Sequence, residues 1–314
     1  AMSSEIEGEW DDVLPMAKAL YQVGDVPQAL PLGLATYLSY FNVDWLADFG
    51  YEASTASWED FRRTVCSARD PERGQVGLGM PARASVLMAM LSASGSEIIG
   101  EDGYYSFADD AGRATASILK TILSGGCGIV YEDWEVGPNR LSRSSMAMIV
   151  ESSERLSEIQ QAILAGRNFT LGLGVLPGPE GPGPTLWYGP GLMVTAPNES
   201  RREAALKVLH WFSTPASQAY WGEATEYIPI RRSVIEAELE ASETLDTLTS
   251  EAELWSIALA AADSDAWVPW PRPTNNITCR ASLLRGLLAF DNPDADADAY
   301  IDAAVTACNT GVSF

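Results

Sequence analysis

The stretch "PNESRREAALKVLHWFSTPASQAYWGEATEYIPIRRSV", residues 197–234, decides the fold of this chain. Asn198 is a good helix N-cap and an acidic residue follows it in the first turn, so we predict a helix over about 198–213. Four apolar residues recur at helical spacing and give this helix one apolar face: Ala205, Val208, Leu209 and Phe212.

A second helix is expected directly after the first. Thr214 and Pro215 are a typical N-cap followed by proline at the first helical position, and the helix should end near Ala224. The motif "YIPIRR" follows this helix pair and ends on Arg231 and Arg232. Such a turn can lie over a cleft, so its paired arginines need an explanation in an acidic chain.

The rest of the chain alternates helices with short apolar strands. The capping box "SWED" begins a helix over 57–68, and further helices are expected over 109–123, 233–241, 250–262, 278–289 and 295–306. Strands are expected over 146–150, 169–177 and 192–197, the last as a buried strand. Alternating helices and strands indicate an α/β protein.

Composition limits the classes of function. The chain has 314 residues, enough for about two domains, and 46% of them are hydrophobic, which argues against disorder. Its 43 acidic and 20 basic residues disfavour nucleic acid and anionic lipid as partners, because both require a basic face. Neither a membrane-spanning apolar run nor a signal peptide is recognisable in the sequence.

The cysteines and the single histidine do not form a metal-binding pattern. Cys66, Cys127, Cys279 and Cys308 contain no Cys-x-x-Cys pair, and His210 lies in a helical run. We therefore expect no metal. The even number of cysteines suits disulfides in an oxidising compartment, and buried free thiols are the alternative.

No catalytic or cofactor motif stands out. The Gly-x-Gly in "LGLGVLPGPEG", residues 171–181, is not followed by a helix, so it does not predict a dinucleotide site. A Ser-His-Asp triad would have to use His210. The many carboxylates allow the acid pair of a glycoside hydrolase, but no motif singles out one pair. We expect no cofactor.

Aromatic residues are more informative. Trp187, Tyr188, Trp267 and Trp270 flank Gly and Pro turns, where their rings can face a cleft. Rings that stack on the apolar faces of a sugar, beside groups that hydrogen-bond its hydroxyls, are typical of a site for a neutral ligand. The alternative is that half of these rings belong to the core or the rim.

Six motifs in order resemble the solute-binding proteins of sugar-type ABC transporters. They are "ALPLGLATYLSYFNVDWLADFGYE" (29–52), "TASWEDF" (55–61), "GGCGIVYEDW" (125–134), "SRSSMAMIVESS" (142–153), "LGVLPGPEG" (173–181) and the stretch from residue 187 to 234. Each motif alone is weak, but their order and spacing are specific, and the resemblance runs from about residue 20 to the end of the chain.

This resemblance implies an α/β fold of the type II periplasmic-binding-protein kind, with two lobes, a hinge and a central cleft. Residues 1–35 and 192–237 would form what remains of lobe I, and residues 36–186 would form lobe II. Residues 187–191 would cross the hinge, and the helices of 238–314 would pack mainly on lobe II. Relatives carry a longer segment before "ALPLG", so we expect an incomplete N-terminal lobe.

The resemblance also implies a ligand site. Trp187, Tyr188 and Trp270 would stack on the ligand. Arg231 would either donate to ligand oxygens or form a scaffold ion pair, and Arg232 would face solvent. The full expected set is Tyr37, Tyr40, Ser85, Glu151, Ser152, Trp187, Tyr188, Arg231, Trp270, Asn275 and Asn276.

Two further expectations come from the resemblance. The branch that looks closest carries cysteines at the positions of Cys66 and Cys127, so the resemblance implies a Cys66–Cys127 disulfide, with Cys279–Cys308 joining two tail helices. The aromatic residue usual after the "ESS" turn is replaced by Glu154, so that stacking has to come from other residues.

The function implied is the substrate-binding component of an ABC importer, not an enzyme. A monomer outside the cytoplasm, extracellular or periplasmic and anchored through a further N-terminal segment, would bind a small sugar and pass it to the transmembrane permease subunits. Alternatives are a glycerol-3-phosphate or polyol binder, an extracellular glycan-active enzyme, and a sensory or scaffold module.

Overall fold

The computed structural model describes residues 10–23, 26–53, 56–243, 250–264, 266–271 and 276–310. Its backbone contacts divide the chain into two units, described here one at a time. Unit 1 comprises residues 1–36, 152–156 and 186–270, and unit 2 comprises residues 37–151, 157–185 and 271–314. Each unit is assembled from separate segments, so the strands β4 and β9 and the end of β7 contribute to both.

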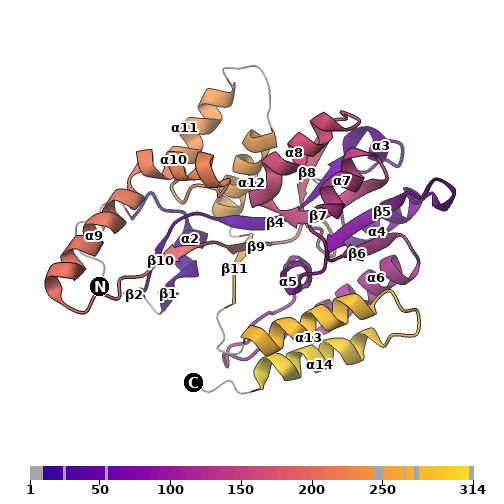
Figure 1. Ribbon diagram of the computed structural model, residues 1–314. Coiled ribbons are helices and arrows are strands. Elements are labelled where there is room, and N and C mark those ends of the chain that lie inside the picture. Colours follow the sequence, from indigo (N-terminus) through magenta and orange to yellow (C-terminus); the bar gives the residue numbers. More distant parts are fainter. Residues whose placement is uncertain are drawn as a thin grey trace. The chain divides into compact units, whose positions relative to one another are not determined.

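Unit 1 contains small sheets and a group of helices (Figure 1). Its helices are α2 (Pro15–Leu20), α9 (Glu199–Ser213), α10 (Pro215–Thr225), α11 (Arg232–Glu243) and α12 (Ser250–Ser264), with the 3-10 turn η2 (Ser153–Arg155). Its strands are β1 (Gln22–Val23), β2 (Val26–Pro27), β3 (Leu30–Pro31), β9 (Thr185–Tyr188), β10 (Gly191–Leu192), β11 (Trp267–Pro269) and the start of β4 (Ala35–Asn42).

The strands of unit 1 pair locally. β1 with β2 and β3 with β10 form antiparallel pairs. β9 pairs antiparallel with the start of β4, and the backbone N–H of Trp270 donates to the carbonyl of Trp187 at 2.8 Å, which attaches the end of β11 to β9. The side chains of Leu14, Leu30 and Leu34 are fully or almost fully buried and form the core of this unit.

Unit 2 is built on a larger sheet. Its strands are β4, β5 (Val76–Pro81), β6 (Gly128–Tyr131), β7 (Met146–Ser152) and β8 (Leu171–Val175). Its helices are α3 (Val43–Ala47), α4 (Trp58–Ser67), the 3-10 turn η1 (Pro71–Arg73), α5 (Ala84–Ala93), α6 (Asp110–Ser124), α7 (Val136–Ser142), α8 (Leu156–Ala165), α13 (Asn276–Ala289) and α14 (Ala297–Asn309).

The sheet of unit 2 is mixed. β5 lies between β6 and β7 and is parallel to both, whereas β8 pairs antiparallel with β4. Every residue of β4, β7 and α5 is buried, so these elements form the centre of the core. This mixture of parallel strands and covering helices is the α/β class expected from the sequence.

The helix predictions are confirmed to within a few residues. The side chain of Asn198 caps α9 by accepting a hydrogen bond from Arg201 N–H, and Thr214 caps α10 in the same way through Ser217 N–H. The capping box of α4 has both of its hydrogen bonds, between Ser57 and Asp60. None of the helices in the described ranges combines the length and apolar character needed to cross a bilayer.

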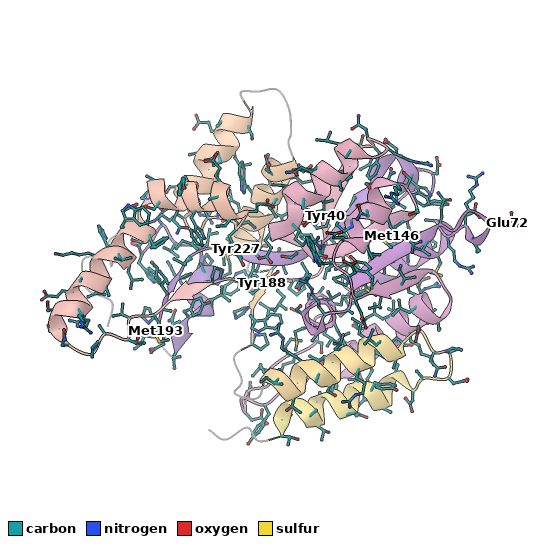
Figure 2. All side chains as sticks on the ribbon, in the orientation of Figure 1. Tyr40, Glu72, Met146, Tyr188, Met193 and Tyr227 are labelled. Carbon is teal, nitrogen blue, oxygen red and sulfur yellow. A yellow bond between two sulfur atoms is a disulfide. The ribbon has the colours of Figure 1, made fainter. Side chains whose placement is uncertain are left out.

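Three expectations differ from the structure. Residues 192–197 are not a buried strand, since β10 ends at Leu192 and the next side chain, Met193, is 62% exposed (Figure 2). The apolar face of α9 is only partly covered, with Leu209 buried, Ala205 and Phe212 half-buried and Val208 more than half exposed. Finally, residues 238–270 belong to unit 1, because α12 packs on α11, and only 271–310 join unit 2.

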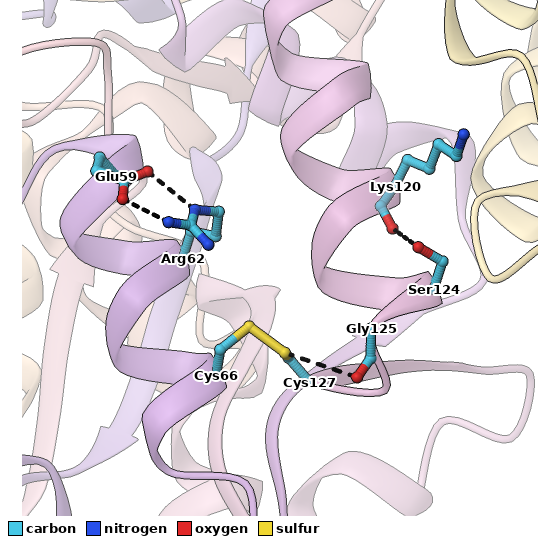
Figure 3. Close-up of a disulfide and its surroundings, with 7 residues drawn as sticks. All are labelled: Glu59, Arg62, Cys66, Lys120, Ser124, Gly125 and Cys127. Carbon is cyan, nitrogen blue, oxygen red and sulfur yellow. Dashed lines mark hydrogen bonds and ion pairs between the residues drawn. A yellow bond between two sulfur atoms is a disulfide. The ribbon is translucent and has the colours of Figure 1, made fainter. Parts of the chain in front are cut away.

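Both disulfides expected from the resemblance are present, and all four cysteines belong to unit 2. Figure 3 shows how Cys66, in the last turn of α4, reaches Cys127, which follows α6 just before β6. Cys279 and Cys308 join the helical hairpin of α13 and α14 (Figure 1). The described residues contain no free cysteine.

Candidate functional site

In unit 1, the serine at the end of β7 contacts a tyrosine, and this tyrosine contacts a tryptophan. Ser152 is buried, and its hydroxyl lies 2.6 Å from the hydroxyl of Tyr188 at the end of β9. The ring of Tyr188 meets that of Trp270 edge to face, with 6.1 Å between centroids and an interplanar angle of 72°. Both residues are half-buried.

A carboxylate lies two residues beyond Ser152. Glu154, in η2, donates its backbone N–H to the Ser152 hydroxyl at 3.3 Å, and its side chain is hydrogen-bonded to the phenol of Tyr227. Burial, followed by that hydrogen bond and the negative charge of Glu154, raises the pKa of Tyr227. The phenol therefore stays protonated and donates to the carboxylate.

The position of Tyr227 depends on a glycine. Tyr227 precedes Ile228, whose backbone pairs with Leu34. A Cβ on Gly33 would lie 2.5 Å from the Cβ of Tyr227, a distance that real side chains do not reach. Gly33 therefore lets the chain after α10 come close to the segment that leads into β4.

A third tyrosine belongs to the same group. The hydroxyl of Tyr21 donates to the carbonyl of Gly189 at 2.6 Å, directly after Tyr188 in the chain. Tyr21 is also near enough to Tyr227 to contribute to raising its pKa. We call this group the aromatic cluster; it consists of Tyr21, Tyr188, Tyr227 and Trp270 together with Ser152 and Glu154.

The aromatic cluster has the chemistry of a site for a polar organic ligand. Phenol and indole rings offer apolar faces, while hydroxyls and a carboxylate offer hydrogen-bond partners. Its members come from five separate stretches of the sequence, and all of them lie in unit 1. Tyr188, Trp270 and Ser152 were expected at the site, whereas Tyr21, Glu154 and Tyr227 were missed.

Some of the missed residues had a signal in the sequence. Glu154 stands where relatives carry an aromatic residue, and Tyr227 opens the "YIPIRR" motif. Both positions had been noted, but only the tertiary structure joins them. Tyr21 had no such signal, because its contact with Gly189 spans 168 residues of sequence.

Unit 2 has polar groups at the carboxyl ends of its parallel strands. In open α/β sheets this edge is where ligands usually bind. Ser85, in the first turn of α5 after β5, shares a hydrogen bond of 2.6 Å with the hydroxyl of Tyr37. Trp134, which follows β6, is 49% exposed. Two expected residues, Tyr37 and Ser85, are therefore in contact here.

Three expected residues lie in the interior. Tyr40, Glu151 and Trp187 have no exposed surface. Tyr40 is central in β4, where it is paired with Leu173 of β8, and Trp187 is the largest fully buried side chain. A side chain buried in this way offers no surface to a ligand, so these three residues are not part of the candidate site.

Arg231 is part of the scaffold of unit 1. It is 3% exposed, its Nη1 lies 3.2 Å from a carboxylate oxygen of Asp12, and its Nε donates to the carbonyl of Ser213. These contacts favour the scaffold interpretation over a ligand donor. Arg232, expected to face solvent, is partly exposed and pairs with Asp263 at 2.6 Å.

Asp12 completes this ion pair. It also accepts hydrogen bonds from the backbone and the side chain of Ser233. Burial opposes its ionisation, but the hydrogen bonds from Ser233 and the contact with Arg231 outweigh burial and lower the pKa of Asp12. The paired arginines of the opening stretch thus attach the start of α11 to the N-terminal segment and to α12.

Two expected residues cannot be placed at the site. Asn275 lies outside the described residues, and Asn276 begins α13 with its side chain outside the described part. Within the described ranges no three His, Cys, Asp or Glu side chains are grouped as a metal site requires. A cavity of about 140 Å³ in unit 2 contains none of the expected residues; it is lined by Gly50, Tyr51, Glu52, Ala56, Asp60, Arg63 and Thr64.

Similar structures share the fold of this chain. A cyclic α-maltosyl-1,6-maltose binding protein from Arthrobacter globiformis is 18% identical with a TM-score of 0.75, and the match covers 96% of this chain and 76% of that one. The GacH receptor of Streptomyces glaucescens, solved unliganded and with acarbose, is 19% identical with a TM-score of 0.73 and the same two coverages.

A third structure is UgpB from Mycobacterium tuberculosis in complex with glycerophosphocholine. It is 17% identical with a TM-score of 0.72, and the match covers 98% of this chain and 77% of that one. At such identities the likeness shows the fold alone. No curated protein matches the sequence.

The family comparison is more specific. The family described as bacterial extracellular solute-binding protein matches residues 4–247, which is well over half of the chain. The resemblance drawn from the six sequence motifs is thereby confirmed. The chain belongs to the family of bacterial extracellular solute-binding proteins.

Proposed function

We propose that the protein is the substrate-binding component of an ABC importer and that its ligand is a carbohydrate or a related polyol. The observation that carries this proposal is the aromatic cluster, in which half-buried rings lie beside a carboxylate and hydroxyls. A sugar presents C–H faces that suit such rings and hydroxyls that suit such polar groups.

The similar structures support this choice of ligand. The ligands named for these proteins include a cyclic maltosyl-maltose, acarbose, maltose, tagatose and ribitol, which are carbohydrates or polyols, besides the glycerophosphocholine of UgpB. The ligand is bound and released outside the cytoplasm, and no bond is made or broken. Delivery to a permease, a monomeric state and binding between two lobes remain predictions.

A thermal-shift screen of the purified chain against sugars and polyols tests the proposal. A ligand present at a hundredfold its dissociation constant should stabilise the folded state by about 2.7 kcal/mol, and the melting curve then rises by several degrees. Calorimetry on each hit gives the affinity, and chromatography of the incubated ligand checks that no product forms.

Two variants localise the binding. Tyr188→Ala and Trp270→Ala each remove one ring of the cluster and should weaken binding about tenfold or more, since a stacked ring contributes on the order of 1 kcal/mol beyond its buried area. Trp211→Ala is the matched control, because Trp211 lies on α9 with 55% of its side chain exposed. Equal affinities in all three variants would refute the assignment of the site.

A further inference from the structure

We infer that the aromatic cluster selects a positively charged nitrogen, so that the preferred ligand is an amine-bearing sugar or polyol and not its neutral counterpart. The inference rests on the proposed function and makes it more specific. It depends on one oxygen atom of Glu154, on the aromatic rings of the cluster and on the comparison with the buried Arg231 of the same unit.

The carboxylate of Glu154 is incompletely paired. Its Oε2 atom is buried and has no hydrogen-bond partner, and its side chain bonds only the phenol of Tyr227. Among the described residues, no arginine or lysine forms an ion pair with it. A carboxylate that leaves water without a cation is costly, so this arrangement favours a cation supplied from outside the chain.

The buried Arg231 of unit 1 is paired within the chain. The guanidinium of Arg231 is paired with Asp12 at 3.2 Å and also donates to the carbonyl of Ser213. That ion pair is complete within the chain and leaves no charge for a ligand. The contrast shows that the missing counter-ion at Glu154 is a local property of the aromatic cluster.

The rings around Glu154 suit the same chemistry. A cation placed over the face of a tyrosine or tryptophan is attracted by the negative face of the ring. Tyr188 meets Trp270 edge to face and lies beside the Ser152 hydroxyl, and Tyr227 is hydrogen-bonded to the carboxylate itself. The net charge of −23 also favours the approach of a cation over that of an anion.

The size of the preference follows from the Coulomb interaction. A positive charge about 6 Å from the carboxylate, at the reduced screening of a partly buried site, should bind about tenfold to a hundredfold more tightly than a neutral group of the same shape. That difference lies within the range of titration calorimetry.

The test uses pairs of sugars that differ only in an ammonium against a hydroxyl. Glucosamine and glucose form one pair, and galactosamine and galactose form another. Calorimetry at pH 6.5 and low salt measures each affinity for the wild type and for Glu154→Gln. This substitution keeps the shape of the side chain and removes its charge.

Two further variants separate charge from structure. Tyr227→Phe removes the hydrogen bond but keeps the carboxylate, so the preference for the amine should persist. Glu203→Gln removes one charge from the exposed surface of α9 and controls for the net charge of the chain. Melting curves of all variants show whether each one folds.

We expect an amine-bearing probe to bind the wild type at least tenfold more tightly than its neutral partner. Glu154→Gln should abolish this preference, whereas Glu203→Gln should preserve it. Equal or tighter binding of the neutral sugars overturns the inference and leaves the proposed function standing. If no probe of either kind binds, the proposed function fails and the inference fails with it.

Discussion

The disulfide between Cys66 and Cys127 should be a main contributor to the stability of unit 2. It joins the last turn of α4 to the residue before β6 across 61 residues of sequence (Figure 3). Cys127 is buried and Cys66 is half-buried, so alanine at both positions removes the bond without adding a buried polar group.

The expected loss follows from the length of the closed loop. The chain-entropy relation for a cross-link over 61 residues gives about 4.3 kcal/mol at 25 °C. The same relation gives about 3.6 kcal/mol for the 29-residue separation between Cys279 and Cys308. For a domain of 150–250 residues each kcal/mol moves the melting temperature by about 2–4 °C, so the first loss corresponds to about 9–17 °C.

Circular dichroism melts of the wild type and of the two double alanine variants measure these losses. The wild type in excess reductant should resemble a variant that lacks both bonds. Mass spectrometry after alkylation of the native, oxidised protein counts the free thiols. A Cys66/Cys127 variant that melts within 2 °C of the wild type would refute the entropic argument, and a native Cys66 that reacts with the alkylating reagent would refute the pairing itself.

Three other predictions concern single contacts. Asp12→Asn should lower the stability at pH 7 by about 1–3 kcal/mol, because it removes the charge opposite the buried Arg231. Since the pKa of Asp12 is lowered by folding, its contribution is full above the ordinary value of 3.8 and is lost as the pH falls through the folded value. Urea melts should therefore converge for wild type and variant as the pH falls through the lowered pKa of Asp12, and a constant gap would contradict this reasoning. Gly77→Ala should lower the free energy of unfolding by about 2 kcal/mol or more, because the new Cβ would lie 1.8 Å from the carbonyl oxygen of Val65. A melting temperature within 1 °C of the wild type would show that α4 does not pack on β5 at this point. Asn198→Ala should cost about 1 kcal/mol by removing the N-cap of α9, with Asn198→Asp as the matched control that keeps a capping oxygen and should melt as the wild type does.

Local sequence signals predicted the elements that depend on local contacts. The capping box at Ser57 and Asp60 and the caps at Asn198 and Thr214 each involve residues three positions apart. Such signals can be read without knowledge of the fold, because the hydrogen bond that begins a helix is formed within one turn. The order of the helices and strands, and with it the family, followed from these local patterns.

Sequence reasoning failed where burial depends on distant segments. Residues 192–197 are as apolar as a buried strand, yet Met193 is exposed, because β10 pairs with β3 over two residues and then ends. Conversely, Trp187 flanks a glycine turn but is fully buried between β4 and the end of β11. The hydrophobicity of a residue shows that it can be buried, whereas the strands that pack over it determine whether it is buried.

The sequence by itself determined the α/β class, the solute-binding family, the helix caps and, through the resemblance, the cysteine pairs. Only the tertiary structure decided the site. In the folded chain Trp187 is fully buried, whereas its neighbour Tyr188 is half-buried. Arg231 forms an ion pair with Asp12, and Tyr21 and Glu154 both lie near Tyr227. The physical reason is that caps and periodicity act within a few residues, while a binding site is formed by side chains whose proximity exists only after the chain has folded.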